Sequence, residues 1–125
     1  MIPVLLVGLG GALGAVARYA VGVAIWRRFP TVNFPFATLF INLSGCLMIA
    51  VFLSATASRA TVSDAWRYVF PIGFVGAYTT FSTYEWELFK LSGEGRWGAA
   101  ALYFAASNGL GFGAVMLGSA LGRRG

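Results

Sequence analysis

The chain has 125 residues, of which 58% are hydrophobic and only 10% are charged, whereas a soluble domain carries about a quarter of charged residues. We therefore expect a single-domain integral membrane protein, and we interpret the net charge of +5 as basic flanks of membrane spans, not as a nucleic-acid surface. The absence of histidine and the presence of only one cysteine exclude thiol–imidazole catalysis and the usual zinc sites, so no enzyme is predicted.

The first predicted span, residues 2–26, is interrupted only by Arg18. An arginine at this depth costs at least about 2.5 kcal/mol unless it snorkels to the interface or lines a wet cavity. Arg18 is therefore a candidate for a pore mouth, with snorkelling as the alternative. Gly10 and Gly14 form a GxxxG pair, which indicates close packing against another helix.

The second predicted span, residues 34–57, carries no charge, and Thr38, Asn42 and Gly45 lie on one helical stripe. Asn42 is about 10 Å from the helix start at Pro35. At that depth its amide needs a partner in protein or water. Two interpretations stay open, an interhelical hydrogen bond and a contact with a polar path.

The third predicted span, residues 66–91, contains the stretch Gly73–Tyr84, in which glycines and hydroxyl residues accumulate. Such residues are modest helix formers whose hydroxyls compete for backbone hydrogen bonds. We therefore expect this helix to be broken near its middle, where its carbonyls face something polar. Glu87 precedes Lys90 by one turn, which predicts a solvated pair near the helix end.

The fourth predicted span, residues 97–122, contains no charged residue but holds Ser107, Asn108 and six glycines. We expect most of these glycines to serve helix packing, with Gly118 and Gly122 as a second GxxxG pair. The sequence thus predicts an all-α membrane protein of four transmembrane helices.

The basic residues are balanced between the two sides of such a protein. Four spans place both termini on one side, and that side carries Arg59, Arg67, Arg123 and Arg124, whereas the other carries Arg27, Arg28, Lys90 and Arg96. Orientation is set by lysine and arginine bias, and here there is none. An antiparallel, dual-topology homodimer follows as a hypothesis.

The run from Gly76 to Tyr84, followed by Glu87, resembles the Fluc (CrcB) family of fluoride channels. Further landmarks of the family occur in the same order along this chain, namely Gly10 to Arg18, Asn42, Tyr103 and Ser107. The resemblance therefore covers essentially the whole chain. It implies a passive fluoride channel that exports fluoride across the bacterial inner membrane. It also implies a dual-topology homodimer with two antiparallel pores, whose partners are fluoride, the lipid bilayer and a second copy.

The resemblance also implies roles for individual residues. A structural Na⁺ on the two-fold axis is expected at the main-chain carbonyls of Gly76 and Thr79. The residues expected along the fluoride path or at its mouth are Asn42, Phe81, Thr83, Tyr84, Ser107, Tyr103, Thr38 and Arg18. This chain departs from the family twice: Tyr84 stands where the family has its second pore phenylalanine, and Gly111 stands where some members have a hydroxyl.

Two other classes of protein share parts of this pattern. A small dual-topology transporter has a similar layout but carries an acid in its first span, where this chain has Arg18. A non-transporting subunit of a membrane complex would use Asn42 and the Thr/Ser cluster as ordinary contacts between helices.

Overall fold

The computed structural model describes residues 1–125, and every regular element in it is helical. Three long helices run the length of the molecule, α1 (Ile2–Arg28), α2 (Phe36–Thr56) and α6 (Trp97–Arg124). They are long and apolar enough to cross a membrane. A fourth path consists of shorter elements in succession: α3 (Asp64–Arg67), the π-helix η1 (Tyr68–Val75), α4 (Gly76–Tyr78) and α5 (Phe81–Gly93). Four helical crossings fit this arrangement.

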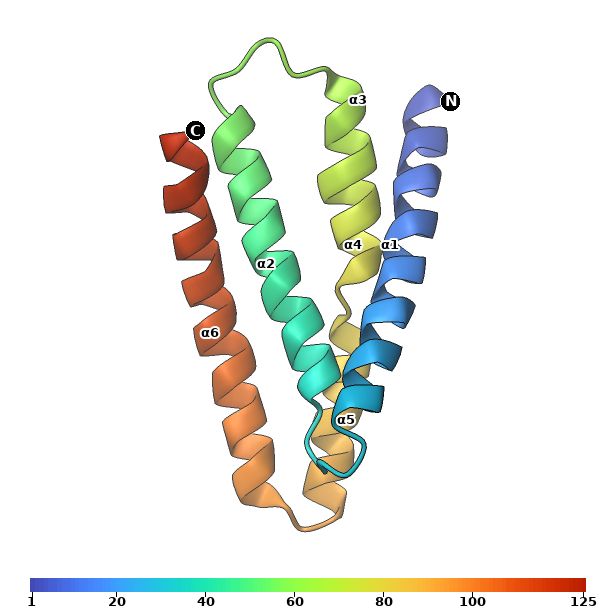
Figure 1. The fold of residues 1–125 in the computed structure, drawn as a ribbon, viewed down its shortest axis with the longest axis vertical. Helices are drawn as coiled ribbons and strands as arrows, with labels where there is room; N and C mark the ends of the chain where they lie inside the picture. The colour runs from blue at the N-terminus through green and yellow to red at the C-terminus, as the bar shows by residue number, and fades with distance from the viewer.

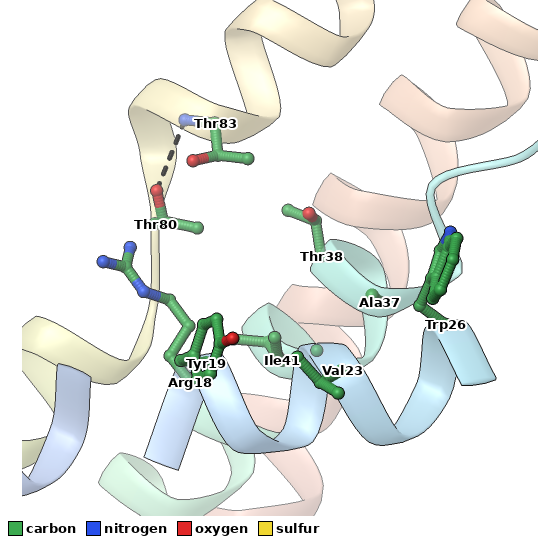
Figure 2. A pocket seen from close by; sticks show the side chains of 10 residues that line it. Arg18, Tyr19, Val23, Trp26, Ala37, Thr38, Ile41, Thr80 and Thr83 are labelled. Carbon is green, nitrogen blue, oxygen red and sulfur yellow. Dashed lines mark hydrogen bonds between the residues drawn. The ribbon is translucent and has the colours of Figure 1, made fainter. Parts of the chain in front are cut away.

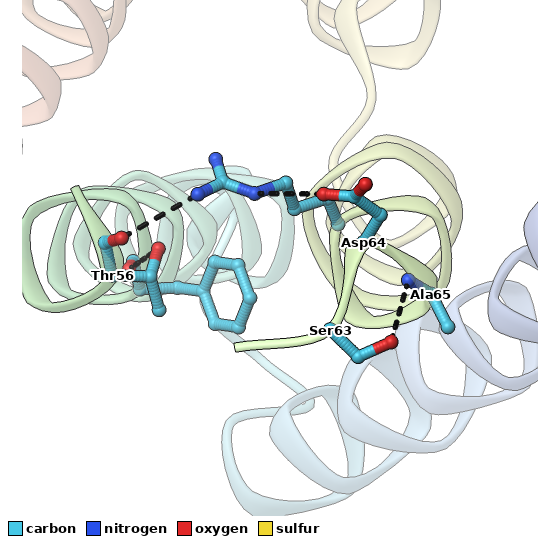
Figure 3. A network of polar contacts seen from close by, with 6 residues as sticks. Thr56, Ser63, Asp64 and Ala65 are labelled. Carbon is cyan, nitrogen blue, oxygen red and sulfur yellow. Dashed lines mark hydrogen bonds and ion pairs between the residues drawn. The ribbon is translucent and has the colours of Figure 1, made fainter. Parts of the chain in front are cut away.

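The connections place both termini at one end of the molecule, together with the loop between α2 and α3 (Figure 1). At this end Arg67 links the two elements that the loop joins. Its guanidinium donates to the Thr56 carbonyl at 3.4 Å and pairs with Asp64 at 3.9 Å, while Ser63 caps α3 by accepting from the Ala65 N–H (Figure 3). The turns between α1 and α2 and between α5 and α6 lie at the opposite end.

Little of the chain is buried inside a single copy. Only 18 of 125 residues are buried, and large apolar side chains such as Leu9, Leu13 and Phe112 are more than half exposed. A monomeric soluble protein rarely exposes apolar patches larger than a few hundred Å². Lipid or another protein chain must therefore cover the outer faces of these helices.

Glycines bring α1 into contact with the backbone of η1. A Cβ atom at Gly10 would collide with the carbonyl oxygen of Val69, and one at Gly14 would collide with the carbonyl of Phe74. These positions have no room for any side chain. The first GxxxG pair is a packing surface, as its sequence predicts.

The second glycine pair does the same for α6 and α2. A Cβ atom at Gly118 would lie 2.7 Å from the Leu47 carbonyl oxygen, and one at Gly122 would lie 2.5 Å from that of Val51. Figure 1 shows α6 running beside α2, with the lower turns of α6 extending beyond the end of α2. The α2–α6 pair is thereby closely packed, as is the pair formed by α1 and η1.

The π-helix η1 is a feature that the sequence pattern does not predict. Pro71 lies inside it and has no N–H, so an ordinary i to i−4 hydrogen bond cannot form at that position. The wider π turn accommodates this defect. Phe70, Phe74 and Tyr78 then stack along one face with centroid separations of 5.7 and 5.8 Å.

Candidate functional site

The candidate site is organised around an interruption of the fourth path between α4 and α5. Helix α4 ends at Tyr78. The next two residues, Thr79 and Thr80, are extended, with ψ of 158° and 116°, and α5 begins at Phe81. Thr80 caps α5 because its hydroxyl oxygen accepts the Thr83 N–H at 3.3 Å. An extended backbone and a threonine side chain are typical of a helix N-cap.

Asn42 of α2 holds this interruption open. Its Nδ2 donates to the Thr80 carbonyl at 3.1 Å, and its Oδ1 accepts the Thr80 N–H at 2.8 Å. Both backbone groups of Thr80 are therefore satisfied by one side chain from another helix. The interhelical bond anticipated for Asn42 is present, and one of its two N–H protons is left for a further partner.

The two hydrogen bonds from Asn42 to Thr80, here called the Asn42 clamp, take the place of hydrogen bonds that a continuous helix would make. In such a helix the Thr80 N–H would donate to the Gly76 carbonyl, but it donates to Asn42. Likewise the Thr83 N–H donates to the Thr80 hydroxyl and not to the Thr79 carbonyl. The carbonyl oxygens of Gly76 and Thr79, the residues predicted to bind a cation, thus lose the N–H partners that a continuous helix would give them.

A groove of about 320 Å³, here called the central groove, opens beside the interruption. Its walls come from α2, η1, α5, α6 and the interruption itself, and none of the residues that line it is charged. The lining residues are Asn42, Gly45, Cys46, Ile49, Val75, Thr79, Thr80, Phe81, Tyr84, Ser107 and Asn108. The Ser107 hydroxyl oxygen is buried and has no hydrogen-bond partner. Phe81 at the groove is 74% exposed in a single copy. Four of the predicted path residues, Asn42, Phe81, Tyr84 and Ser107, are thus brought together.

Tyr84 forms the inner wall of this groove. Its ring lies 6.0 Å from that of Phe81 and meets the Tyr103 ring edge-on at 5.1 Å. Its hydroxyl accepts a hydrogen bond from Asn108 at 3.1 Å. Tyr103 is fully buried behind Tyr84 and does not line the central groove, so it supports the wall from within.

The remaining predicted path residues line a second groove of about 320 Å³, here called the Arg18 groove (Figure 2). Arg18 of α1, Thr38 of α2 and Thr83 of α5 all line it. Thr80 lines both grooves, so the two meet at the interruption. The predicted path residues other than Tyr103 therefore line two grooves that share Thr80.

The prediction of a solvated pair between Glu87 and Lys90 is wrong. Glu87 points inward, where its carboxylate accepts from the Thr38 hydroxyl at 2.5 Å and from the Tyr103 hydroxyl at 3.4 Å. The protein's one ion pair is elsewhere, between Arg67 and Asp64. Two hydroxyl donors outweigh an exposed pair with lysine, which is worth little in water. A signal existed, since Glu87 follows Tyr84 by one turn of the same helix.

Comparison with known proteins agrees with this geometry. Residues 5–119 match the family described as CrcB-like protein, Camphor Resistance (CrcB). The chain belongs to the CrcB family. As a CrcB protein with three helices able to span a membrane, it is a multi-pass membrane protein.

Several relatives resemble this CrcB chain over nearly their whole length, and each is named "Fluoride-specific ion channel FluC". The protein of Acidobacterium capsulatum is 49% identical over 118 residues, which cover 94% of both chains. That of Solibacter usitatus is 38% identical over 120 residues, covering 96% of this chain and 98% of its own. That of Trichormus variabilis is 41% identical over 118 residues, covering 94% and 85% respectively.

Proposed function

We propose that this CrcB protein is a passive, fluoride-selective channel of the bacterial inner membrane. The names of its relatives support the choice of ion. The observation that carries the proposal is the central groove, which presents aromatic edges and polar donors but no charged side chain, and whose Ser107 hydroxyl has no partner in the protein. A buried polar group without a partner calls for an explanation, and a transient ligand supplies one.

The chemistry of the groove suits a small, strongly hydrated anion. Aromatic rings have a positive edge, so Phe81 and Tyr84 favour an anion weakly while their bulk excludes larger ones. The Asn42 amide and the Ser107 hydroxyl are conventional donors. Conduction requires sites that are strong enough to admit the ion and weak enough to release it. The central groove, which no charged side chain lines, meets that requirement.

In this proposal the fluoride path continues from the central groove into the Arg18 groove. Arg18 provides positive charge at the mouth and the Thr83 hydroxyl provides a further donor, whereas Thr38, whose hydroxyl proton is donated to Glu87, only lines the wall. Tyr103 contributes by holding Tyr84 and Glu87 in place. An anion that leaves one groove reaches the other by passing Thr80.

We further propose that the functional unit is an antiparallel homodimer in which the interruption lies at mid-membrane. The balance of basic residues between the two ends supports insertion in both orientations. The exposure of Phe81 supports a second copy that closes the central groove, because a pore aromatic facing lipid would line no path.

A structural Na⁺ at the dimer centre fits the residues present. Hard cations prefer oxygen ligands, and the carbonyls of Gly76 and Thr79 lack the N–H partners that a continuous helix would give them. A bound cation there would supply positive charge that offsets the cost of an anion at mid-membrane. The carbonyls of two copies together would complete its ligand set.

The test is fluoride efflux from liposomes that contain the purified protein, followed with a fluoride electrode and repeated with chloride. We expect fast efflux of fluoride only, and a strong loss of that efflux for Ser107→Ala and for Phe81→Ile.

The Asn42 clamp also suits a non-transporting subunit, because such a contact joins helices without any ion. Fluoride and chloride traces that both equal those of empty liposomes would favour that alternative.

A further inference from the structure

The amide of Asn108 has a fixed orientation. Its Nδ2 donates to the Phe104 carbonyl at 2.9 Å and to the Tyr84 hydroxyl at 3.1 Å. A carbonyl oxygen only accepts hydrogen bonds, so the nitrogen side of the amide must face Phe104 and therefore also Tyr84. Both N–H protons of Asn108 are thereby engaged.

The consequence for Tyr84 is that its hydroxyl oxygen acts as the acceptor. The proton of the same hydroxyl has no acceptor in the protein, since the bond from Asn108 is the one hydrogen bond that this group makes. Tyr84 is buried, with 6% of the residue's surface exposed, and it lines the central groove. Any acceptor for this proton must come from the groove.

A second hydroxyl in the groove, that of Ser107, also has a proton without an acceptor in the protein. Ser107 precedes Asn108 on α6, and its hydroxyl oxygen is buried without a partner. No carboxylate lines the central groove, so no side chain there competes strongly for either proton. Two free hydroxyl protons in an uncharged groove are complementary to a small anion, because a hydrogen bond to an ion is about twice as strong as a neutral one.

We propose that the Tyr84 hydroxyl is an anion donor in the central groove, that it acts together with Ser107, and that Asn108 is the positioning residue that turns its proton toward the anion. This inference rests on the proposed function and deepens it, because it assigns a donor role to the residue that departs from the family pattern. Fluoride is the anion that it would bind. Asn108 itself does not touch the anion; it acts through Tyr84.

The first test measures the fluoride efflux rate as a function of the internal fluoride concentration. Tyr84→Phe keeps the ring and removes the donor, and it should raise the half-saturating concentration about tenfold. The matched control is Tyr68→Phe, which removes a phenol hydroxyl that lies outside both grooves and should leave that concentration unchanged. Equal values for wild type and Tyr84→Phe would overturn the proposal.

The second test separates positioning from general support. Asn108→Ala should raise the half-saturating concentration in the wild-type background and change nothing further in Tyr84→Phe, because Asn108 acts through the missing hydroxyl. Additive effects would overturn the role of Asn108. Gel filtration of each variant confirms that it is folded.

A third measurement does not depend on flux. Donation of the phenol proton to fluoride should shift the near-ultraviolet tyrosine absorbance on addition of fluoride, and Tyr84→Phe should abolish that shift. Wild-type protein that conducts fluoride but shows neither this shift nor a Tyr84→Phe effect refutes the donor role alone. Wild-type protein that conducts no fluoride refutes the proposed function as well.

Discussion

Replacement of Asn42 by alanine should destabilise the fold through loss of the Thr80 clamp. Asn42→Ala removes two hydrogen bonds, of 3.1 and 2.8 Å, and leaves the Thr80 N–H and carbonyl without their partners. Interhelical hydrogen bonds in membrane proteins are worth about 0.6 kcal/mol on average and up to about 1.7. Two of them correspond to about 1–3 kcal/mol. We expect the lower half of this range, because water in the adjoining grooves can reach Thr80.

The free energy of unfolding can be measured by titration with dodecyl sulfate in mixed micelles, with tryptophan fluorescence as the signal, since the chain has four tryptophans. Asn33→Ala is the matched control, because Asn33 is exposed in the turn between α1 and α2 and should change the free energy by less than about 0.5 kcal/mol. If Asn42→Ala is as stable as Asn33→Ala, the clamp does not support the interruption and the reasoning is refuted.

Three further predictions concern packing, Glu87 and the cation. Gly14→Ala forces a methyl group into the Phe74 carbonyl and should lower the thermal midpoint far more than Gly113→Ala, whose Cβ would meet nothing within 4 Å; equal midpoints would contradict the close approach of α1 and η1. Thr38→Val removes a donor to the Glu87 carboxylate and should cost about 1–3 kcal/mol in the same unfolding assay; an unchanged free energy would show that the bond is worth nothing. Purification with K⁺ in place of Na⁺ should weaken the dimer in gel filtration, and an unaltered profile would speak against a structural Na⁺.

The helical nature of the fold follows from composition, because a chain with so few charges must pair its backbone groups internally in lipid. The glycine pairs likewise indicate their packing role, as Gly14 and Gly118 show, since small residues at this spacing have few other uses in lipid. The π-helix could not be predicted. It depends on how the backbone around Pro71 relaxes against α1, which is a property of the tertiary contact and not of the local pattern.

The candidate site could be predicted in its residue types but not in its division. Asn42, Phe81, Tyr84 and Ser107 meet in one groove, whereas Arg18, Thr38 and Thr83 line another. Spacing along a helix identifies a shared face, but it does not reveal where a neighbouring backbone divides that face. Glu87 lies one turn from both Tyr84 and Lys90, and the donors that decide between an inward and a solvated carboxylate lie on two other helices.

The interruption at Thr79 and Thr80 also has a symmetry consequence. A helix that breaks exposes carbonyl oxygens at the end of one half and amide hydrogens at the start of the other, so opposite partial charges lie a few residues apart. A two-fold axis through such a site brings each group opposite its own copy. In the proposed antiparallel dimer, carbonyls would then face carbonyls, and the two copies would repel each other there until a cation separated them. In an antiparallel pair, cation binding and association of the two copies would therefore be one coupled equilibrium, with neither complete without the other.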